Sequence, residues 1–274
     1  MLRALVATQL GAGRAAALVD GLVVHPSLLE PADGDVSRAV IAQALAIVLL
    51  DDLLQRVPSA AAYVEGRWAG GERLVLAHGA VRTVTGVACG ELAPGRESVA
   101  RVLRPLGYTP ADAGGSVWRH LDQPAELPGY LVDEIPADAF SEPFTAAAAR
   151  VVRSSRDPLT GLAQVHLDRL AAAGHLAPKA AESLLGELVA CFARHHGTPA
   201  LANYEILLAE SEEMAWIATE GTTWHHAAVV VDDPVASRPE PATVECSFKV
   251  GERATVTLLV PGSYLELIPS RSNR

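Results

Sequence analysis

The sequence predicts an α+β fold in which two strand-rich segments have helices before and between them. The hydrophobic pattern changes from long helical runs to short β-branched runs and back again, and Gly and Pro separate the runs. With 274 residues, half of them apolar, the chain can bury roughly 75% of its unfolded surface, which is enough for one large domain. We expect a single domain over 1–274 in four parts: a helical N-terminal segment (1–72), a first β-rich module (73–136), a helical insert (137–211) and a second β-rich module (212–274).

A long apolar run predicts the main helix of the N-terminal segment. This helix is expected over Ser37–Leu54, with Asp35 or Ser37 as its N-cap and Pro58 as its far limit. Its most apolar stretch, Ala39–Leu50, is too short to cross a bilayer. Because no secretory cleavage pattern follows the start of the chain, we expect a cytoplasmic protein.

The first β-rich module is expected to run strand, helix, strand, strand. Residues 74–85 form a short apolar run that ends in β-branched residues, which favours a strand. A helix is expected over Glu97–Arg104, where Pro105 stops it. Two further strands are expected over Ser116–Leu121 and Tyr130–Ile135.

In the helical insert and the second β-rich module, Gly and Pro again separate the runs that predict helices and strands. The insert is expected to hold helices over Thr145–Val152, Thr160–Ala173, Pro178–His195 and Pro199–Ala209. The second module is expected to hold strands over Met214–Ala218, Thr222–Val231, Thr243–Val250 and Thr255–Ile268, the last two forming a hairpin.

Charge and cysteine content exclude several classes of protein. The 22 basic and 32 acidic residues give a net charge of −10 without a block of like charges, which argues against a nucleic-acid surface. Three cysteines, Cys89, Cys191 and Cys246, lie far apart, so neither a disulfide framework nor a zinc knuckle is predicted.

His78 is the most informative of the nine histidines, because it lies inside an apolar strand with Arg82 four residues later. Residues 78, 80 and 82 of a strand point to one face. Two interpretations stay open. His78 is a core histidine beside an Arg that pairs with an internal carboxylate, or a metal or anion supplies the partner that buried polar groups need.

A second histidine pair and a carboxylate extend the candidate site. His225 and His226 are adjacent on a predicted strand, so only one of them can face a given site. Glu266 lies among apolar residues of the last predicted strand, where an exposed edge charge is the alternative interpretation. Together His78, His226 and Glu266 match the two-histidine, one-carboxylate set that suits non-haem Fe(II) and leaves positions open for substrate.

Three short motifs resemble one known family. They are His78-Gly79-Ala80-Val81-Arg82, the segment Trp216–Ala227 and the segment Pro261–Glu266. Together they resemble the 2-oxoadipate dioxygenase/decarboxylase family, also called hydroxyglutarate synthases, and the similarity runs from about Ala39 to the end of the chain. The resemblance implies a vicinal-oxygen-chelate-like mixed sheet built from the two modules.

The resemblance also implies a ligand set and a substrate-binding residue. Fe(II) would be bound by His78, His226 and Glu266, and Arg82 would be the catalytic residue that holds the substrate carboxylate. The family often has Asn where this chain has His225, so His225 stays open as the second ligand. The chain is also shorter than the bacterial members, so the metal chemistry transfers better than the substrate.

The activity implied by the resemblance is an Fe(II)-dependent dioxygenase. It would decarboxylate a 2-oxo acid similar to 2-oxoadipate and hydroxylate the shortened acid to a 2-hydroxy acid. Its partners would be that acid and O2, with no nucleic acid and no membrane, and the oligomeric state stays open. Two other classes also stay open: a non-oxidative metal-dependent isomerase or lyase of the same fold, and a metal-free small-molecule binding protein.

Other polar residues are weaker candidates. Glu220, Thr222 and Thr223 precede the second histidine pair, and two interpretations stay open: they orient His226, or they are ordinary polar residues of a strand. His120 is a candidate pocket residue, and Arg119 should point to the opposite side of their strand.

Overall fold

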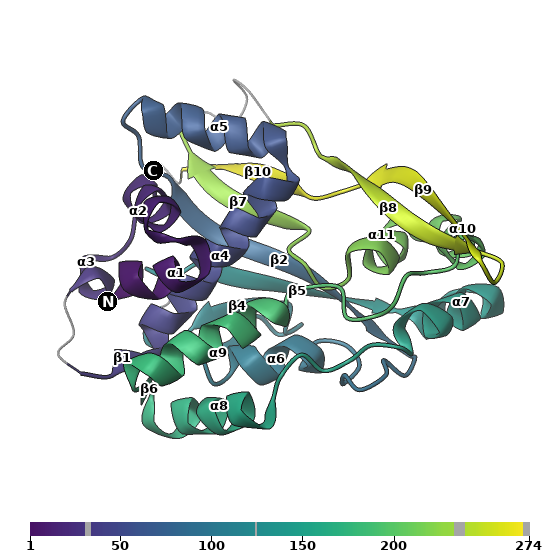
Figure 1. Ribbon diagram of the computed structural model, residues 1–274, viewed down its shortest axis with the longest axis horizontal. Helices are drawn as coiled ribbons and strands as arrows, with labels where there is room; N and C mark the ends of the chain where they lie inside the picture. The colour runs from purple at the N-terminus through teal and green to yellow at the C-terminus, as the bar shows by residue number, and fades with distance from the viewer. Residues whose placement is uncertain (31–33, 124, 233–238, 271–274) are drawn as a thin grey trace.

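A six-stranded mixed β-sheet forms the centre of the described chain, residues 1–30, 34–123, 125–232 and 239–270 of a computed structural model (Figure 1). The strand order is β10 (Tyr264–Pro269), β7 (His226–Val231), β2 (Val75–Thr85), β5 (Gly129–Pro136), β4 (Val117–His120) and β3 (Tyr108–Pro110). The β10–β7 and β2–β5 pairs are parallel, and the other neighbours are antiparallel. Strands from both predicted β-rich modules therefore lie in one sheet, and the predicted α+β class is confirmed.

Helices cover one face of this sheet. The central helix is α4 (Arg38–Arg56), which packs on β7 and against α1, α5 and α9. It is buried almost all round, and the Ser37 hydroxyl accepts a hydrogen bond from the Val40 amide as its N-cap. The other helices that contribute to this larger apolar core are α1 (Leu2–Leu10), α2 (Ala12–Gly21), α3 (Pro26–Leu29), α5 (Pro58–Ala69), α6 (Glu97–Leu103), α8 (Gly161–Ala173) and α9 (Pro178–Ala190). Two short strands, β1 (Val36–Ser37) and β6 (His175–Leu176), pair at its edge.

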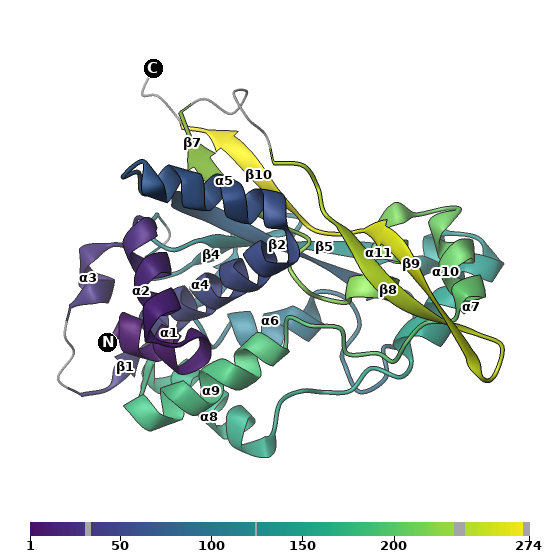
Figure 2. The ribbon, with the colours of Figure 1, turned by 45° about the horizontal axis from the view of Figure 1, so that its top comes forward.

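A second, smaller core lies at the other end of the sheet. Its apolar side chains come from the far ends of β2 and β5, from three α-helices and one 3-10 helix, and from a separate hairpin. Besides β2 and β5, these elements are η1 (Ala137–Ala139), α7 (Glu142–Val152), α10 (Leu201–Leu208), α11 (Glu212–Glu220), β8 (Thr243–Val250) and β9 (Ala254–Pro261). Figure 2 shows the β8–β9 hairpin beside α10 and α11, away from the helices of the larger core.

The strand predicted over Met214–Ala218 is wrong, because these residues lie in helix α11. The Ser211 hydroxyl accepts a hydrogen bond from the Met214 amide, which caps the helix. Glu212 and Glu213 in the first turn favour the positive end of the helix dipole. Capping therefore outweighs the strand-like composition of this segment.

The single strand predicted over Thr255–Ile268 is also wrong, because it is two strands that belong to different sheets. The hairpin strand β9 ends at Pro261, whose missing amide cannot donate to a ladder. After Gly262 and Ser263, β10 pairs with β7 in the central sheet. The predicted hairpin itself, β8 with β9, is confirmed.

The N-terminal segment holds more helices than the one placed by its sequence pattern. Pro58 does limit α4, but it is also the first residue of α5, where its fixed φ suits a helix start. None of the helices within the described residues is both long and apolar enough to cross a membrane.

Candidate metal centre

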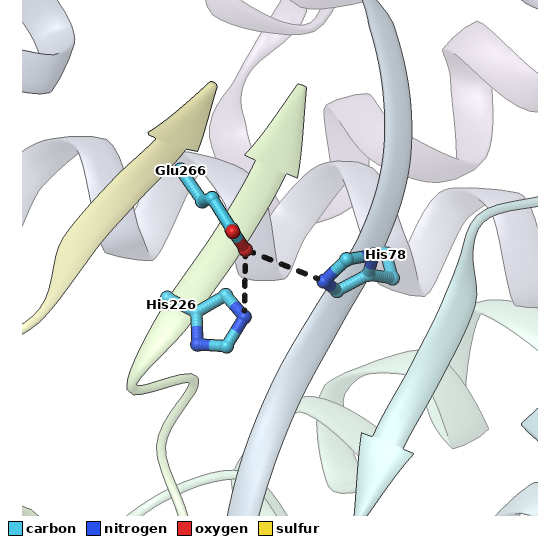
Figure 3. A group of neighbouring side chains, drawn as sticks. All are labelled: His78, His226 and Glu266. Atoms are coloured by element: carbon cyan, nitrogen blue, oxygen red, sulfur yellow. Dashed lines mark ion pairs between the residues drawn. The ribbon is translucent and has the colours of Figure 1, made fainter. Parts of the chain in front are cut away.

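Three strands bring His78, His226 and Glu266 together on one face of the central sheet. His78 lies on β2, His226 begins β7, and Glu266 lies on β10. Glu266 Oε2 is 3.4 Å from His226 Nε2 and 3.9 Å from His78 Nε2 (Figure 3). One ligand atom from each residue lies within 4.8 Å of the other two. We call these three residues the trio.

A β-bulge in β2 turns His78 toward the trio. Leu76 pairs with Val229 of β7, whereas His78 pairs with the adjacent residue Ala228, so two residues of β2 oppose one of β7. Leu76 therefore packs into the larger core while His78 points the other way. Without the extra residue, the alternation of a strand would place both side chains on one face.

The two faces of the sheet differ sharply in chemistry. The helix-covered face carries apolar side chains such as Val81, Val229 and Leu265, all within the larger core. The opposite face, which we call the site face, carries the trio. Ala228 lies between Glu266 and His78 in the strand register, and its small side chain leaves room for the two longer ones to meet.

Burial keeps both histidines of the trio neutral near pH 7. Burial and nearby Arg119 lower the pKa of His78 to about 4, and burial together with His78 and Arg82 lowers the pKa of His226 to about 4. A neutral imidazole has the lone pair that a metal ligand needs. Both residues can therefore bind a cation without first losing a proton.

The donor atoms of the trio fit a metal ion. His78 Nε2 and both ring nitrogens of His226 are buried without a hydrogen-bond partner among the described residues. Leaving such groups unsatisfied costs on the order of 1–3 kcal/mol each. A divalent cation between two imidazoles and one carboxylate would satisfy them, and this donor set suits non-haem Fe(II).

Arg82 lies beside the trio, farther along β2. Its guanidinium is 5.6 Å from the centre of the Trp216 ring and makes no hydrogen bond or ion pair with another described residue. Burial lowers the pKa of Arg82, although the nearby Glu213, Tyr264 and Asp133 act to raise it. With Glu213, Trp216 and Tyr264 it lines a cavity of about 430 Å³, so a cationic group is available to an anion bound there.

The structure separates His225 from His226. The His225 ring is buried between Trp216 and His226, and its amide donates to the carbonyl of Ala80. Burial, mainly, lowers the pKa of His225 to about 2. His226, whose ring stacks on Tyr264, is the residue that approaches Glu266. The geometry therefore favours His226 as the second ligand.

The weaker candidates lie elsewhere. Thr222 and Thr223 donate to backbone carbonyls, and the Glu220 carboxylate lies 3.7 Å from Arg56, so none of these residues orients His226 through a hydrogen bond. His120 points into the larger core, where its Nδ1 accepts from the amides of Asp122 and Gln123. His120 is therefore a core histidine, and this candidate is set aside.

Two residues that were not site candidates in the sequence analysis lie near the site. Arg119 occupies the site face opposite His120, as strand alternation requires, and the alternation itself could have identified it. Arg56, at the end of α4, donates to the Ser263 hydroxyl and, at 3.2 Å, to the carbonyl of Trp224. The Ser263 hydroxyl also donates to that carbonyl. The segments leading into β7 and β10 are thus held by one side chain.

Comparison with known protein structures identifies the superfamily of this fold. A crystal structure described as a glyoxalase superfamily protein from Ralstonia eutropha JMP134 is 36% identical, with a TM-score of 0.91 over 98% of this chain and 94% of that one. The chain belongs to the glyoxalase superfamily. The vicinal-oxygen-chelate-like fold predicted from the sequence is confirmed at this level.

More distant structures share the fold of this glyoxalase-superfamily chain. Hydroxyglutarate synthase from Pseudomonas putida in complex with 2-oxoadipate is 16% identical with a TM-score of 0.57, over 86% of this chain and 66% of that one. The enzyme from Oryza sativa, also in complex with 2-oxoadipate, is 17% identical with a TM-score of 0.52, over 88% and 85%. No protein-family model and no curated protein sequence matches the chain.

Proposed function

We propose that the protein is a non-haem Fe(II)-dependent dioxygenase that decarboxylates a 2-oxo acid and hydroxylates the shortened acid to a 2-hydroxy acid. The observation that carries this proposal is the trio itself, with its ligand atoms within 4.8 Å and, beside it, Arg82, which makes no ion pair with another described residue. Hydroxyglutarate synthases, crystallised with 2-oxoadipate, share the fold and suggest that a similar acid is the substrate.

Each residue has a distinct task in this reaction. His78, His226 and Glu266 would hold Fe(II), which supplies chelation of the 2-oxo acid and activation of O2 when bound. The Arg82 guanidinium would bind the substrate carboxylate through paired N–H donors and fix its orientation. The neutral imidazoles keep the site ready for the cation at neutral pH.

The overall reaction balances without an external reductant. A 2-oxo acid and O2 give CO2 and a 2-hydroxy acid with one carbon fewer. One oxygen atom enters the new carboxylate and the other becomes the hydroxyl group. The electrons come from cleavage of the bond to the lost carboxylate and from the C–H bond that is hydroxylated.

An oxygen-electrode assay tests this proposal. The protein is loaded anaerobically with Fe(II), desalted, and mixed with a panel of 2-oxo acids in aerated buffer, while CO2 and the product are measured by mass spectrometry. We expect equal amounts of O2 consumed, CO2 released and 2-hydroxy acid formed.

The same assay separates the alternative classes. Stoichiometric iron without O2 uptake for any acid would contradict the proposal and favour a non-oxidative isomerase or lyase. Failure to retain iron, Mn(II), Co(II) or Zn(II) after desalting would also contradict it and favour a metal-free binding protein.

A further inference from the structure

A second cavity lies at the end of the central sheet where the β2–β5 ladder begins. The first register pair of these two parallel strands is His78 with Gly129, so residues 75–77 of β2 have no strand beside them on the β5 side. Residues 75–77 and the loop 125–128 line a cavity of about 470 Å³ there, and no member of the trio is among its lining residues. This volume lies in the range of small-molecule sites. The cavity is therefore a candidate site separate from the metal centre.

One buried amide lines this cavity without a partner. Gln43 of α4 is 3% exposed, and its side chain makes no hydrogen bond with another described residue. A buried amide without a partner is costly, and an apolar side chain of similar size would avoid that cost. Stability alone therefore does not explain a glutamine at this position. A ligand in the cavity can supply the donor and the acceptor that Gln43 lacks.

Two side chains of opposite charge line the same cavity without pairing. Arg119 and Glu126 form no ion pair with each other or with another described residue, whereas Arg96, for example, pairs with Glu134. Gly129 lets Arg119 reach the cavity from the site face, because a Cβ atom there would lie 2.7 Å from Arg119 Nη1. A ligand that carries both a carboxylate and an ammonium group can meet two charges that do not reach each other.

The remaining side chains that line the cavity are apolar, and Leu22, Leu76 and Leu127 among them are buried. Apolar walls suit the methylene groups of a ligand. A charged ligand side chain against these walls would lose its hydration without gaining a counter-ion, because Gln43 is neutral. The lining therefore favours a side chain that is uncharged and ends in a hydrogen-bonding group.

We propose that this cavity binds a free α-amino acid with an uncharged polar side chain. Arg119 holds the carboxylate through paired N–H donors, and Glu126 holds the ammonium group. The ligand side chain lies along the apolar wall and hydrogen-bonds to Gln43. This site goes beyond the proposed function, because no member of the trio takes part and no 2-oxo acid is needed.

Titration calorimetry with L-glutamine tests the proposal on the full-length, metal-free protein. Metal is removed because amino acids chelate metal ions, which would add binding at the trio. L-Glutamate is nearly isosteric with L-glutamine and adds a charge to the side chain. N-Acetyl-L-glutamine lacks the ammonium charge, and the α-amide of L-glutamine lacks the α-carboxylate.

The variants remove one polar group of the cavity at a time, and they are Gln43→Leu, Arg119→Leu and Glu126→Gln. The matched control is Gln55→Leu, because Gln55 lies on the same helix, outside the cavity, and its amide donates to Asp51 at 2.7 Å. The double variant His78→Ala, His226→Ala reports any binding at the trio.

We expect Arg119→Leu and Glu126→Gln to raise the Kd for L-glutamine about 10- to 100-fold, as for the loss of a charge-assisted hydrogen bond. N-Acetyl-L-glutamine should bind the wild type and Glu126→Gln equally weakly, since the charge that Glu126 meets is already absent. L-Glutamate should bind at least about tenfold more weakly than L-glutamine.

Gln43→Leu should lose affinity for L-glutamine while its melting temperature stays the same or rises, because an unpaired buried amide is gone. Gln55→Leu and the double trio variant should bind L-glutamine within about twofold of the wild type. Because Arg119 and Glu126 are exposed, their variants keep the test valid if Gln43→Leu does not fold.

Four results would overturn the proposal. The first two are no binding of any uncharged polar L-amino acid by the wild type, and wild-type affinity in all three cavity variants. The third is loss of binding in the double trio variant alone, which would locate the amino acid at the trio. The fourth is a lower melting temperature of Gln43→Leu with an unchanged Kd, which would make Gln43 a structural residue. None of these results bears on the dioxygenase, which O2 uptake tests separately.

Discussion

The two faces of the central sheet use the same strands for opposite purposes. On the helix-covered face, side chains such as Val229 and Leu265 are almost fully buried in the larger core. On the site face, Glu266 lies one residue from Leu265 and His226 three residues from Val229, and both ring nitrogens of His226 have no partner among the described residues. One face stabilises the fold, and the other face holds the groups that would bind the proposed metal. Substitutions on the two faces should therefore separate stability from binding.

The largest effect is expected on the site face. Replacing His78, His226 or Glu266 with Ala should weaken iron binding by more than about 100-fold, since substitution of residues that only support a ligand costs up to that factor. O2 uptake should be lost, while the unfolding free energy of the metal-free protein changes little. Iron content after anaerobic loading and desalting measures the effect.

His175→Ala is the matched control for the trio variants. His175 is exposed and pairs with Asp35 on the far side of the helices, so its loss should leave iron content unchanged. Full iron occupancy in Glu266→Ala would remove Glu266 from the ligand set.

A substitution at Leu265, next to Glu266, should lower stability and leave iron binding unchanged. Leu265→Ala removes a side chain that is 1% exposed and should lower the free energy of unfolding by about 2–5 kcal/mol. Iron stoichiometry should be unchanged at temperatures where the variant is folded. Urea unfolding gives the first quantity and metal analysis the second; a stability loss below about 1 kcal/mol would contradict the contrast between the faces.

Acid should lower the free energy of unfolding of the metal-free protein, because two histidines of the site face bind protons more weakly in the folded state. His78 and His226 have pKa values of about 4 when folded and bind protons near the ordinary pKa of about 6.5 when unfolded. Between these values the unfolded state holds more protons, so stability falls as the pH drops from about 6.5 to about 4, by a few kcal/mol in total. Urea midpoints across this range measure it.

The double variant His78→Gln, His226→Gln is the comparison for this pH effect. It should show a flatter dependence than the wild type between pH 6.5 and 4. An identical slope in the two proteins would show that other groups cause the acid sensitivity.

The smallest effect is expected at Arg82. Arg82→Lys keeps the charge but loses the planar fork, so KM for the 2-oxo acid should rise about tenfold. Iron content should not change, because Arg82 does not belong to the trio. Steady-state O2 uptake over a range of acid concentrations measures the change, and unaltered kinetics would remove Arg82 from substrate binding.

The sequence predicted the elements with strong local patterns. The β-branched run in β2 and the apolar run in α4 with its Ser37 cap both form where expected, because local preference and burial agree there. The trio was predicted through the motif resemblance, since the wide separation of its members along the chain carries little information.

Features set by long-range pairing could not be predicted. Leu76 and His78 share a face under strict alternation, and only the pairing of β2 with β7 shows the bulge that separates them. The division of the last predicted strand at Gly262 and Ser263 likewise depends on which partner β10 finds. The α11 helix was missed for a local reason, because its Ser211 cap was not weighed against the strand-like residues that follow.

Arg56 connects the helical layer to the starts of two strands of the central sheet, through its hydrogen bonds to Ser263 and to the carbonyl of Trp224. Trp224 stands two residues before His226, and Ser263 three residues before Glu266, so a side chain from the last turn of α4 links the segments that lead into two members of the trio. A change in the helical layer that shifts α4 would alter the distance between these donors without touching either one. If the trio binds a metal as proposed, its choice of cation should therefore respond to substitutions in α4 that contact none of the ligands.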